Sequence, residues 1–278
     1  MSSTLDKITA ATRRRILAAK QSVDIDHLER LAEVHIPRGF RRSLESRSQT
    51  GPAVIAELKK ASPSRGLIRS DFDARSLAIE LEQGGAAALS VLTDEEFFQG
   101  SLEYLRSASA STQLPCLRKD FIVDEIQLLE ARANRADAIL LITAALSQSE
   151  LEMLARRAGQ YHLDVLCEVH NRGEVKRAID AGCNLIGVNN RDLQTFRVDL
   201  ETAFRLADLI PTEAFRVAES GIHSAAEIRQ LEEAGYRAFL IGESLMQSKS
   251  PGTALETLIA ESKRRPAGSL GTVHEAGR

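Results

Sequence analysis

Eight short apolar runs alternate with helix-like segments along most of the chain. Between the runs, apolar residues recur three and four positions apart, as in residues 72–85, which end in two glycines. Ser224 lies three residues before Glu227 and predicts a capping box at the start of another helix. The runs are residues 52–59, 87–93, 114–121, 137–143, 163–170, 184–190, 215–220 and 237–244.

This alternation predicts an α/β fold, a (β/α)8 TIM barrel. Strands that alternate with helices pair in parallel through right-handed crossovers, and eight such units make up a closed barrel. An open, doubly wound sheet is the alternative. The barrel is favoured because the runs number eight and no G-x-G-x-x-G motif follows the first of them.

The position of the runs divides the chain into three parts. Residues 1–50 are expected to form an N-terminal helical extension packed on the barrel, with helices in "TLDKITAATRRRILAAKQ" and "DIDHLERLAEV" and an irregular basic stretch up to Thr50. The pattern does not decide which end of the barrel they cover. Residues 51–261 are expected to form the barrel, and residues 262–278 a flexible C-terminal tail.

Composition narrows the class of protein. The 278 residues are 43% hydrophobic and 27% charged, with a net charge of −3, which is typical of a soluble globular protein. No basic domain indicates a nucleic-acid partner, and the clusters Arg13-Arg14-Arg15 and Arg41-Arg42 are expected only to solvate helix faces. The apolar stretches are too short to span a membrane, and the N-terminus lacks a secretory signal.

The three cysteines, Cys116, Cys167 and Cys183, lie within or beside apolar runs. An odd number without a C-x-x-C motif predicts reduced thiols that serve packing in a cytoplasmic protein.

Polar side chains gather at the carboxyl ends of the runs. In a parallel barrel these ends meet at one mouth, where active sites lie. Side chains two apart on a strand share a face, so each of these can point inward, Lys119 with Leu117 and Ser220 with Ala218. Any one of them is explained by an ordinary strand end, but their convergence on one mouth indicates a site. They are Glu57, Lys59, Lys119, Glu168, Asn189 and Ser220.

The residue types at this mouth predict acid–base chemistry beside a phosphate site. Charges held together away from water shift one another's pKa values, which poises some groups for proton transfer near neutrality. Ser220-Gly221-Ile222 follows the seventh run, and Gly242-Glu243-Ser244 starts a short helical turn after the eighth. Backbone N–H groups there bind phosphate in barrels of this kind. Ser62 and Ser64 can add hydroxyl donors.

The motifs "ELKKASPSRG", "LPCLRKDFIVDEIQ", "LCEVHN", "IGVNNRDL", "VAESGI" and "FLIGESLM" resemble those of the indole-3-glycerol phosphate synthase family, in order and with suitable spacing, over about residues 5–257. The resemblance implies a cytoplasmic enzyme of tryptophan biosynthesis, with no cofactor and no metal, that acts on a small phosphosugar and has no nucleic-acid or membrane partner. It implies conversion of 1-(2-carboxyphenylamino)-1-deoxyribulose 5-phosphate to indole-3-glycerol phosphate, CO2 and water. The chain is expected to be a monomer.

The resemblance also implies roles for individual residues. Lys119 would be the general acid at the ribulose carbonyl, and Lys59 would hold the substrate carboxylate and is a second candidate for the acid at dehydration. Glu168 would take part in the later proton transfers, with Glu57 and Asn189 orienting these groups. The residues implied in phosphate binding are Ser62, Ser220, Gly221, Gly242 and Glu243, and those implied in the rest of the substrate pocket are Arg191, Phe98 and Phe121.

Three alternatives remain. A barrel isomerase of the phosphoribosylanthranilate type needs a cysteine and an aspartate at strand ends, yet Cys116 lies within its run with a parity opposite to Lys119. A metal-dependent lyase would need Cys167 and His170 to share an ion, but on a strand they face apart, which favours a packed thiol and a loop histidine. A non-catalytic phosphosugar-binding barrel would bind the substrate without turning it over.

Overall fold

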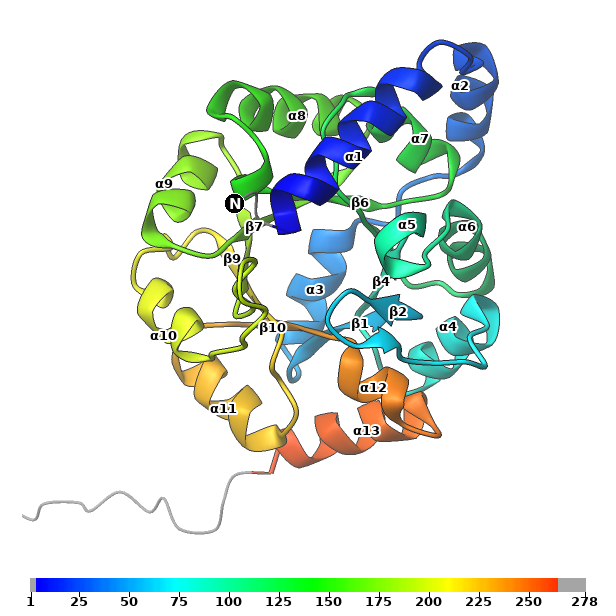
Figure 1. The fold of residues 1–278 in the computed structure, drawn as a ribbon. Helices are drawn as coiled ribbons and strands as arrows, with labels where there is room; N and C mark the ends of the chain where they lie inside the picture. The colour runs from blue at the N-terminus through cyan, green and yellow to red at the C-terminus, as the bar shows by residue number, and fades with distance from the viewer. Residues whose placement is uncertain (1–3, 265–278) are drawn as a thin grey trace, which may run out of the picture.

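The fold is a closed barrel of eight parallel strands surrounded by helices (Figure 1). The computed structural model describes residues 4–264. Hydrogen bonding around the barrel follows the order β1-β10-β9-β8-β7-β6-β5-β4, which confirms the predicted (β/α)8 architecture. Every predicted run contains one strand, shortened at its ends. The strands are β1 Ala53–Leu58, β4 Ala88–Leu92, β5 Cys116–Lys119, β6 Ala138–Ile142, β7 Asp164–Val169, β8 Leu185–Asn189, β9 Phe215–Glu219 and β10 Ala238–Ile241.

Helices make the crossovers on the outside of the barrel, and a small hairpin follows β1. The predicted capping box of Ser224 and Glu227 is present at the start of α11. The hairpin pairs β2 (Ala61–Ser62) with β3 (Gly66–Leu67). The helices after the hairpin are α4 Ala74–Gln83, α5 Glu95–Phe98, α6 Leu102–Ser111, α7 Ile126–Ala133, α8 Gln148–Gln160, α9 Arg172–Asp180, α10 Glu201–Ala207, α11 Ala225–Glu233, α12 Glu243–Gln247 and α13 Pro251–Ser262.

Alternation along the strands separates two apolar layers. Residues such as Val54 and Ala56 belong to the large cluster between the strands and the outer helices. Ala53 and Ile55 belong to a smaller cluster inside the barrel. Because Glu57 continues the second series, its carboxylate lies above this inner cluster at the carboxyl end of β1.

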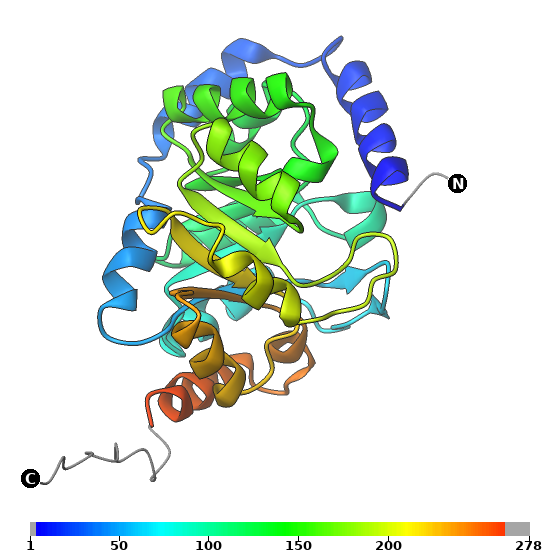
Figure 2. The ribbon, with the colours of Figure 1, turned by 90° about the vertical axis from the view of Figure 1, so that its left-hand side faces the viewer.

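The N-terminal extension contacts both ends of the barrel. Helix α1 (Thr4–Ala19) lies on the mouth side, and α3 (Phe40–Ser48) lies at the opposite base, as Figure 2 shows. Helix α2 (Ile25–Val34) packs against α7 between them. The prediction of an irregular stretch up to Thr50 was therefore wrong. Only Phe40 and Leu44 are apolar and buried in α3, one turn apart, and they close the inner cluster from below, so the helix depends on a tertiary contact.

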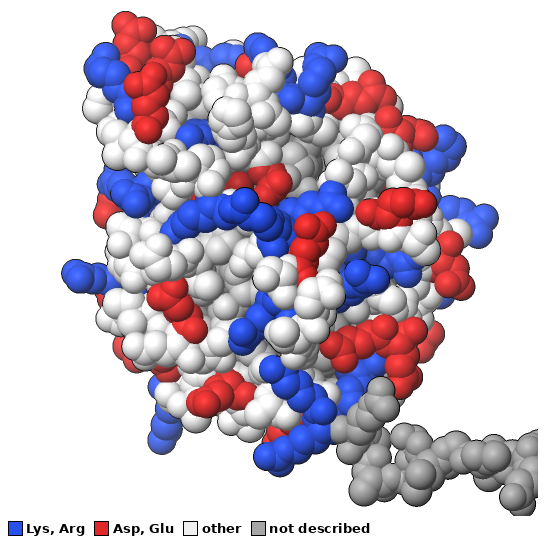
Figure 3. All heavy atoms as spheres, turned by 180° about the vertical axis from the view of Figure 1, so that it is seen from behind, with Lys and Arg blue, Asp and Glu red and all other residues white. Residues whose placement is uncertain are grey.

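The arginines of the extension make specific contacts, contrary to the prediction that they only solvate helix faces. Figure 3 shows the base, where lysine and arginine side chains form a band. There Arg41 pairs with Glu45 at 2.7 Å, and the Nη2 of Arg47 donates to the Gly85 carbonyl. On the mouth side, Arg13 pairs with Glu150 of α8 at 2.8 Å.

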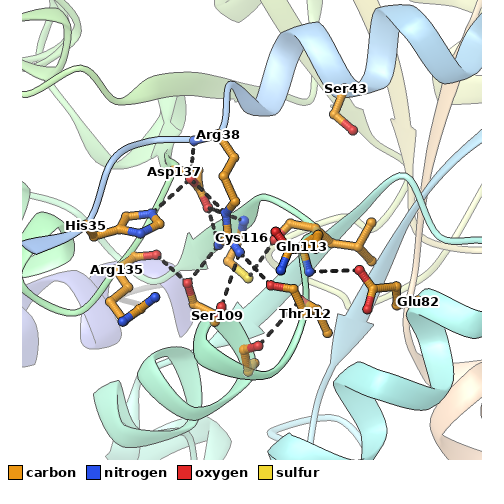
Figure 4. Close-up of polar contacts among 12 residues, drawn as sticks. His35, Arg38, Ser43, Glu82, Ser109, Thr112, Gln113, Cys116, Arg135 and Asp137 are labelled. Atoms are coloured by element: carbon orange, nitrogen blue, oxygen red, sulfur yellow. Dashed lines mark hydrogen bonds and ion pairs between the residues drawn. The ribbon is translucent and has the colours of Figure 1, made fainter.

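A buried carboxylate, Asp137, joins the extension to the start of β6 (Figure 4). It accepts hydrogen bonds from His35 Nε2 at 3.0 Å, from the Arg38 backbone N–H at 2.7 Å and from the Cys116 N–H at 2.7 Å. The Arg38 guanidinium forms an ion pair with it at 2.6 Å. Burial works against the charge of Asp137, but these donors outweigh it and lower the pKa of the carboxyl.

We expect Asp137→Ala to destabilise the protein by roughly 3–5 kcal/mol, because it leaves the buried donors of His35, Arg38 and Cys116 without their partner. Urea unfolding at pH 7 measures this, with Asp208→Ala at an exposed helix end as the control. The wild-type protein should also lose this contribution as the pH falls, because a carboxyl with a lowered pKa stabilises only while it is ionised. Equal stability of the two variants would show that the Asp137 contacts do not hold the extension in place.

Three further features concern the C-terminal helix, the cysteines and the absence of a membrane-spanning helix among the described residues. Helix α13 continues through Ser262, whose side chain is buried, and the rest of the predicted tail beyond Arg264 lies outside the described residues. The three cysteines are free, as predicted. Among residues 4–264, no helix has the length and apolar character needed to cross a membrane.

Candidate active site

Two lysines and three carboxylates form a buried cluster at the mouth. Lys119, at the end of β5, lies 3.7 Å from Glu57 and 3.6 Å from Glu168, measured from Nζ to the nearest carboxylate oxygen. Lys59 lies 2.9 Å from the other oxygen of Glu57. The closed sheet therefore brings together side chains from β1, β5 and β7, as the sequence predicted.

The third carboxylate, Glu219, was missed by the sequence analysis. It ends β9, is 1% exposed, and one of its carboxylate oxygens lies 3.6 Å from Lys119 Nζ. The predicted parity of this strand was wrong: Val217 belongs to the inner cluster and Ala218 to the outer one, so Glu219 points inward. The alternation of Val217 with Glu219 was the available signal.

Ser220 reaches the mouth by a different route from the one predicted. The strand ends before it, and its backbone adopts a left-handed conformation with φ of 66°. The chain therefore leaves the sheet at Ser220, and strand parity does not apply to it. Its side chain still lines the pocket beside Glu219.

Two glycines make room for the carboxylates. A Cβ atom on Gly187 of β8 would collide with the Glu219 carboxyl, and one on Gly242 would lie 2.7 Å from Glu57 Oε1. These positions are therefore glycine because a buried side chain from a neighbouring strand occupies the space.

The cluster shifts the proton affinity of its members in different directions. Burial disfavours the charged forms throughout, but the three carboxylates outweigh it at Lys119 and raise its pKa. Lys59 and Lys119 likewise lower the pKa of Glu57 against the effect of burial. Burial, reinforced by the negative charge of Glu168, raises the pKa of Glu219 to about 8. The group poised near neutrality is thus Glu219, which the sequence analysis had not included.

We expect Glu219→Gln to flatten the pH dependence of stability. In the folded protein Glu219 keeps its proton up to about pH 8, whereas the unfolded chain releases it near the ordinary value of 4.5. Its stabilising contribution is therefore complete below pH 4.5 and is lost as the pH rises to about 8, with a slope of at most ~1.4 kcal/mol per pH unit. Urea unfolding at several pH values in this window measures the slope, and an identical slope in both proteins would contradict the protonation of Glu219.

One side of the pocket above the cluster is aromatic and apolar. Phe98 and Phe121 lie with their ring centroids 6.2 Å apart. Leu5 and Ile8 of α1 complete this side. This surface suits a flat apolar ring held close to Lys119.

The other side of the pocket is polar and suits an anion. It is lined by backbone that follows β9 and β10, including Gly221 and Gly242, and by the hairpin residues Ser64 and Arg65. Arg191 lies at the junction of the two sides, with its guanidinium 3.4 Å from Glu243. Gly221 has φ of 77° and a Cβ there would collide with Val198, so glycine is required at this turn.

Cys167 and His170 do not share an ion site. Cys167 faces the outer layer, with its sulfur 3.3 Å from the Thr143 hydroxyl. His170 lies in the loop after β7, as predicted, and its ring is largely buried beside Glu168. In the part of the chain that the structure describes, no group of three or more histidine, cysteine or carboxylate side chains could hold a metal ion.

Comparison with known proteins identifies the family. The model of the indole-3-glycerol phosphate synthase family matches residues 5–258. An indole-3-glycerol phosphate synthase from Koribacter versatilis is 59% identical over 259 residues, covering 93% of this chain and all of that protein. Another from Desulfotalea psychrophila is 47% identical over 260 residues, covering 93% of this chain and 99% of that protein. The chain belongs to the indole-3-glycerol phosphate synthase family.

Similarity to solved structures extends beyond the indole-3-glycerol phosphate synthase family but concerns the fold alone. A 3-hexulose-6-phosphate synthase superposes with a TM-score of 0.62 at 12% sequence identity, over 75% of this chain and 99% of that one.

The residues that the resemblance to the indole-3-glycerol phosphate synthase family singled out all line the two adjoining sides of the pocket. The ones on the side of the acid–base cluster are Glu57, Lys59, Ser62, Phe98, Lys119, Phe121, Glu168, Asn189, Arg191 and Ser220. The ones on the polar side alone are Gly221, Gly242 and Glu243.

Proposed function

We propose that this pocket carries out the indole-3-glycerol phosphate synthase reaction through Lys119 as general acid and Glu168 as proton acceptor. Membership of the family makes the protein a carboxy-lyase of tryptophan biosynthesis. Its substrate joins a carboxylated aniline ring to a ribulose 5-phosphate. The observation that carries the proposal is one ammonium, Lys119, held among three buried glutamate side chains between an aromatic and an anion-binding surface.

The two sides of the pocket fit the two ends of this substrate. The ring lies against Phe98 and Phe121, and the phosphate lies against Ser62, Gly221 and the backbone of Glu243. Binding the ends fixes the ring carbon next to the ribulose carbonyl, which replaces an improbable encounter by a bound geometry. Because the protein is net negative and the substrate is an anion, positive charge has to be gathered locally.

Lys119 acts in ring closure. The ring carbon that bears the carboxylate attacks the ribulose carbonyl carbon, and the carbonyl oxygen gains negative charge as its π bond opens. The Lys119 ammonium, which the surrounding carboxylates keep charged, donates its proton to this oxygen. Lys59 meanwhile holds the substrate carboxylate, which then leaves as CO2 and returns its bonding electrons to the ring.

Glu168 acts in the loss of water. The new hydroxyl leaves with a proton from Lys59 or Lys119, and Glu168 accepts the proton that must leave carbon for the aromatic indole to form. Glu57 orients the ammonium groups, because it contacts both lysines. Asn189 and Ser220 orient the substrate hydroxyls.

The proton on Glu219 keeps the cluster from carrying excess negative charge. With Glu219 neutral, the charges of Glu57 and Glu168 balance those of Lys59 and Lys119 before the substrate binds. The site can therefore admit an anionic substrate without repelling it.

Fluorescence-detected formation of indole-3-glycerol phosphate from the anilino-ribulose phosphate by the purified protein, with no metal or nucleotide added, tests the proposal. Release of CO2 in equal amount distinguishes ring closure from an isomerisation. Tight binding of the substrate without any indole product would instead indicate a non-catalytic phosphosugar-binding barrel.

We also propose that the protein acts in the cytoplasm as a monomer. Its three free cysteines support a reducing compartment. Sedimentation of the purified protein measures the oligomeric state.

A further inference from the structure

The ring of His170 lies beside the carboxylate of Glu168. His170 follows the last residue of β7, and its ring is 12% exposed. The ring nitrogen Nδ1 lies 3.0 Å from Glu174 Oε2 of α9, and Nε2 lies 3.4 Å from Glu168 Oε1. Nε2 is buried and has no hydrogen-bond partner, and neither has the second oxygen of Glu168, which faces Lys119.

The surroundings of this ring favour its charged form. Burial disfavours an imidazolium, but the bond to Glu174 and the negative charge of Glu168 outweigh it and raise the pKa of His170. The other titratable groups that face it are Glu219, from β9, and Asp192, from the loop after β8. No cation among the described residues contacts Glu168 apart from Lys119 and His170.

The ring is not needed to form the turn in which it lies. The backbone N–H of His170 donates to Glu174 Oε2 at 2.7 Å, and Asn171 caps α9 by accepting from the Glu174 N–H. These contacts fix the path of the chain whichever side chain stands at position 170. The contact of Nε2 with Glu168 therefore depends on the imidazole ring and not on the backbone of the turn.

We propose that His170, held by Glu174, is a positioning residue that directs the Glu168 carboxylate toward Lys119. The inference rests on the proposed role of Glu168 as proton acceptor. Lys119 lies 3.6 Å from one oxygen of Glu168 and His170 Nε2 lies 3.4 Å from the other, so the carboxylate is held between two positive charges. This arrangement fixes the direction in which Glu168 accepts a proton from the substrate.

Two substitutions distinguish the effect of the charge on His170 from the effect of its length. His170→Gln can place an amide nitrogen near the position of Nε2, whereas His170→Asn can replace only Nδ1 toward Glu174; both remove the charge. We expect His170→Gln to keep most of the wild-type kcat and His170→Asn to lose most of it, because only the longer amide reaches Glu168. KM should be unchanged in both variants.

The matched variants are Glu174→Gln, which weakens the charge on His170 without touching Glu168, and His27→Gln on the exposed face of α2. Glu174→Gln should lower kcat by less than His170→Asn does, and His27→Gln should leave kcat unchanged. A wild-type kcat in His170→Asn overturns the inference.

Titration of His170 by NMR separates this inference from the proposed function. In the Glu168→Gln protein, the midpoint of the His170 ring signals should fall, because a negative neighbour is gone. An unchanged midpoint overturns the contact between the two side chains. Full turnover by Glu168→Gln would overturn the proposed function instead, since the carboxylate would then not be the proton acceptor.

Discussion

Lys119→Ala should lower kcat by roughly 10²–10⁴-fold, the usual contribution of a positioned acid. The substitution removes the ammonium that protonates the carbonyl oxygen during ring closure. KM should change much less, because the contacts to the ring and the phosphate remain. The fluorescence assay under saturating substrate measures kcat.

The fold should survive this substitution, although three carboxylates lose their common partner. Glu57, whose pKa Lys119 helps to lower, can take up a proton in place of the lost charge, so the variant should lose stability as the pH rises and recover it as the pH falls. Thermal unfolding at pH 6 and pH 8 checks this. Lys176→Ala on the outer helix α9 is the control, because its ion pair with Asp180 is exposed. A near-normal kcat for Lys119→Ala would remove Lys119 from the mechanism.

Glu168→Gln should lower kcat by an amount within the same range of roughly 10²–10⁴-fold. The amide has the size of the carboxylate but cannot accept the proton that leaves carbon, so the intermediate after decarboxylation should accumulate. Release of CO2 in a single turnover should then run ahead of indole fluorescence, which separates this step from the earlier one at Lys119.

Two outcomes test the role of Glu168 directly. Equal rates of CO2 release and indole formation in Glu168→Gln, both near the wild-type rate, would exclude it as the proton acceptor. Glu256→Gln on the exposed side of α13 makes the same chemical change outside the site and should leave both rates as they are.

The sequence predicted most of the barrel because its strands and helices have different periods. Each of the eight runs contains one strand, and the sheet is closed. Helix α3 was not predicted, since two buried apolar residues in a basic segment give no periodic signal. Its helical form depends on the base of the barrel, into which Phe40 and Leu44 fit.

Most site residues that continue a regular strand were predicted, and Glu219 is the exception. Lys119 and Glu168 lie on the inner face at the carboxyl ends of β5 and β7, so counting in twos from Leu117 and Leu166 finds them. Glu219 was lost by a one-residue error in parity, which moves every side chain of a strand to the other face. Ser220 lies after the strand in a left-handed turn, a conformation that no alternation predicts.

By itself, the sequence determined the order of strands and helices, the mouth at which the polar residues meet and the family to which the chain belongs. These depend on local spacing and on motifs, both of which can be read from the amino-acid sequence without a structure. Only the tertiary structure decided which carboxylate holds a proton near neutral pH, because the pKa of Glu219 depends on burial and on charges from β1, β5 and β7. It likewise decided the orientation of His170 toward Glu168, because Glu174, which fixes the ring, lies on the next helix.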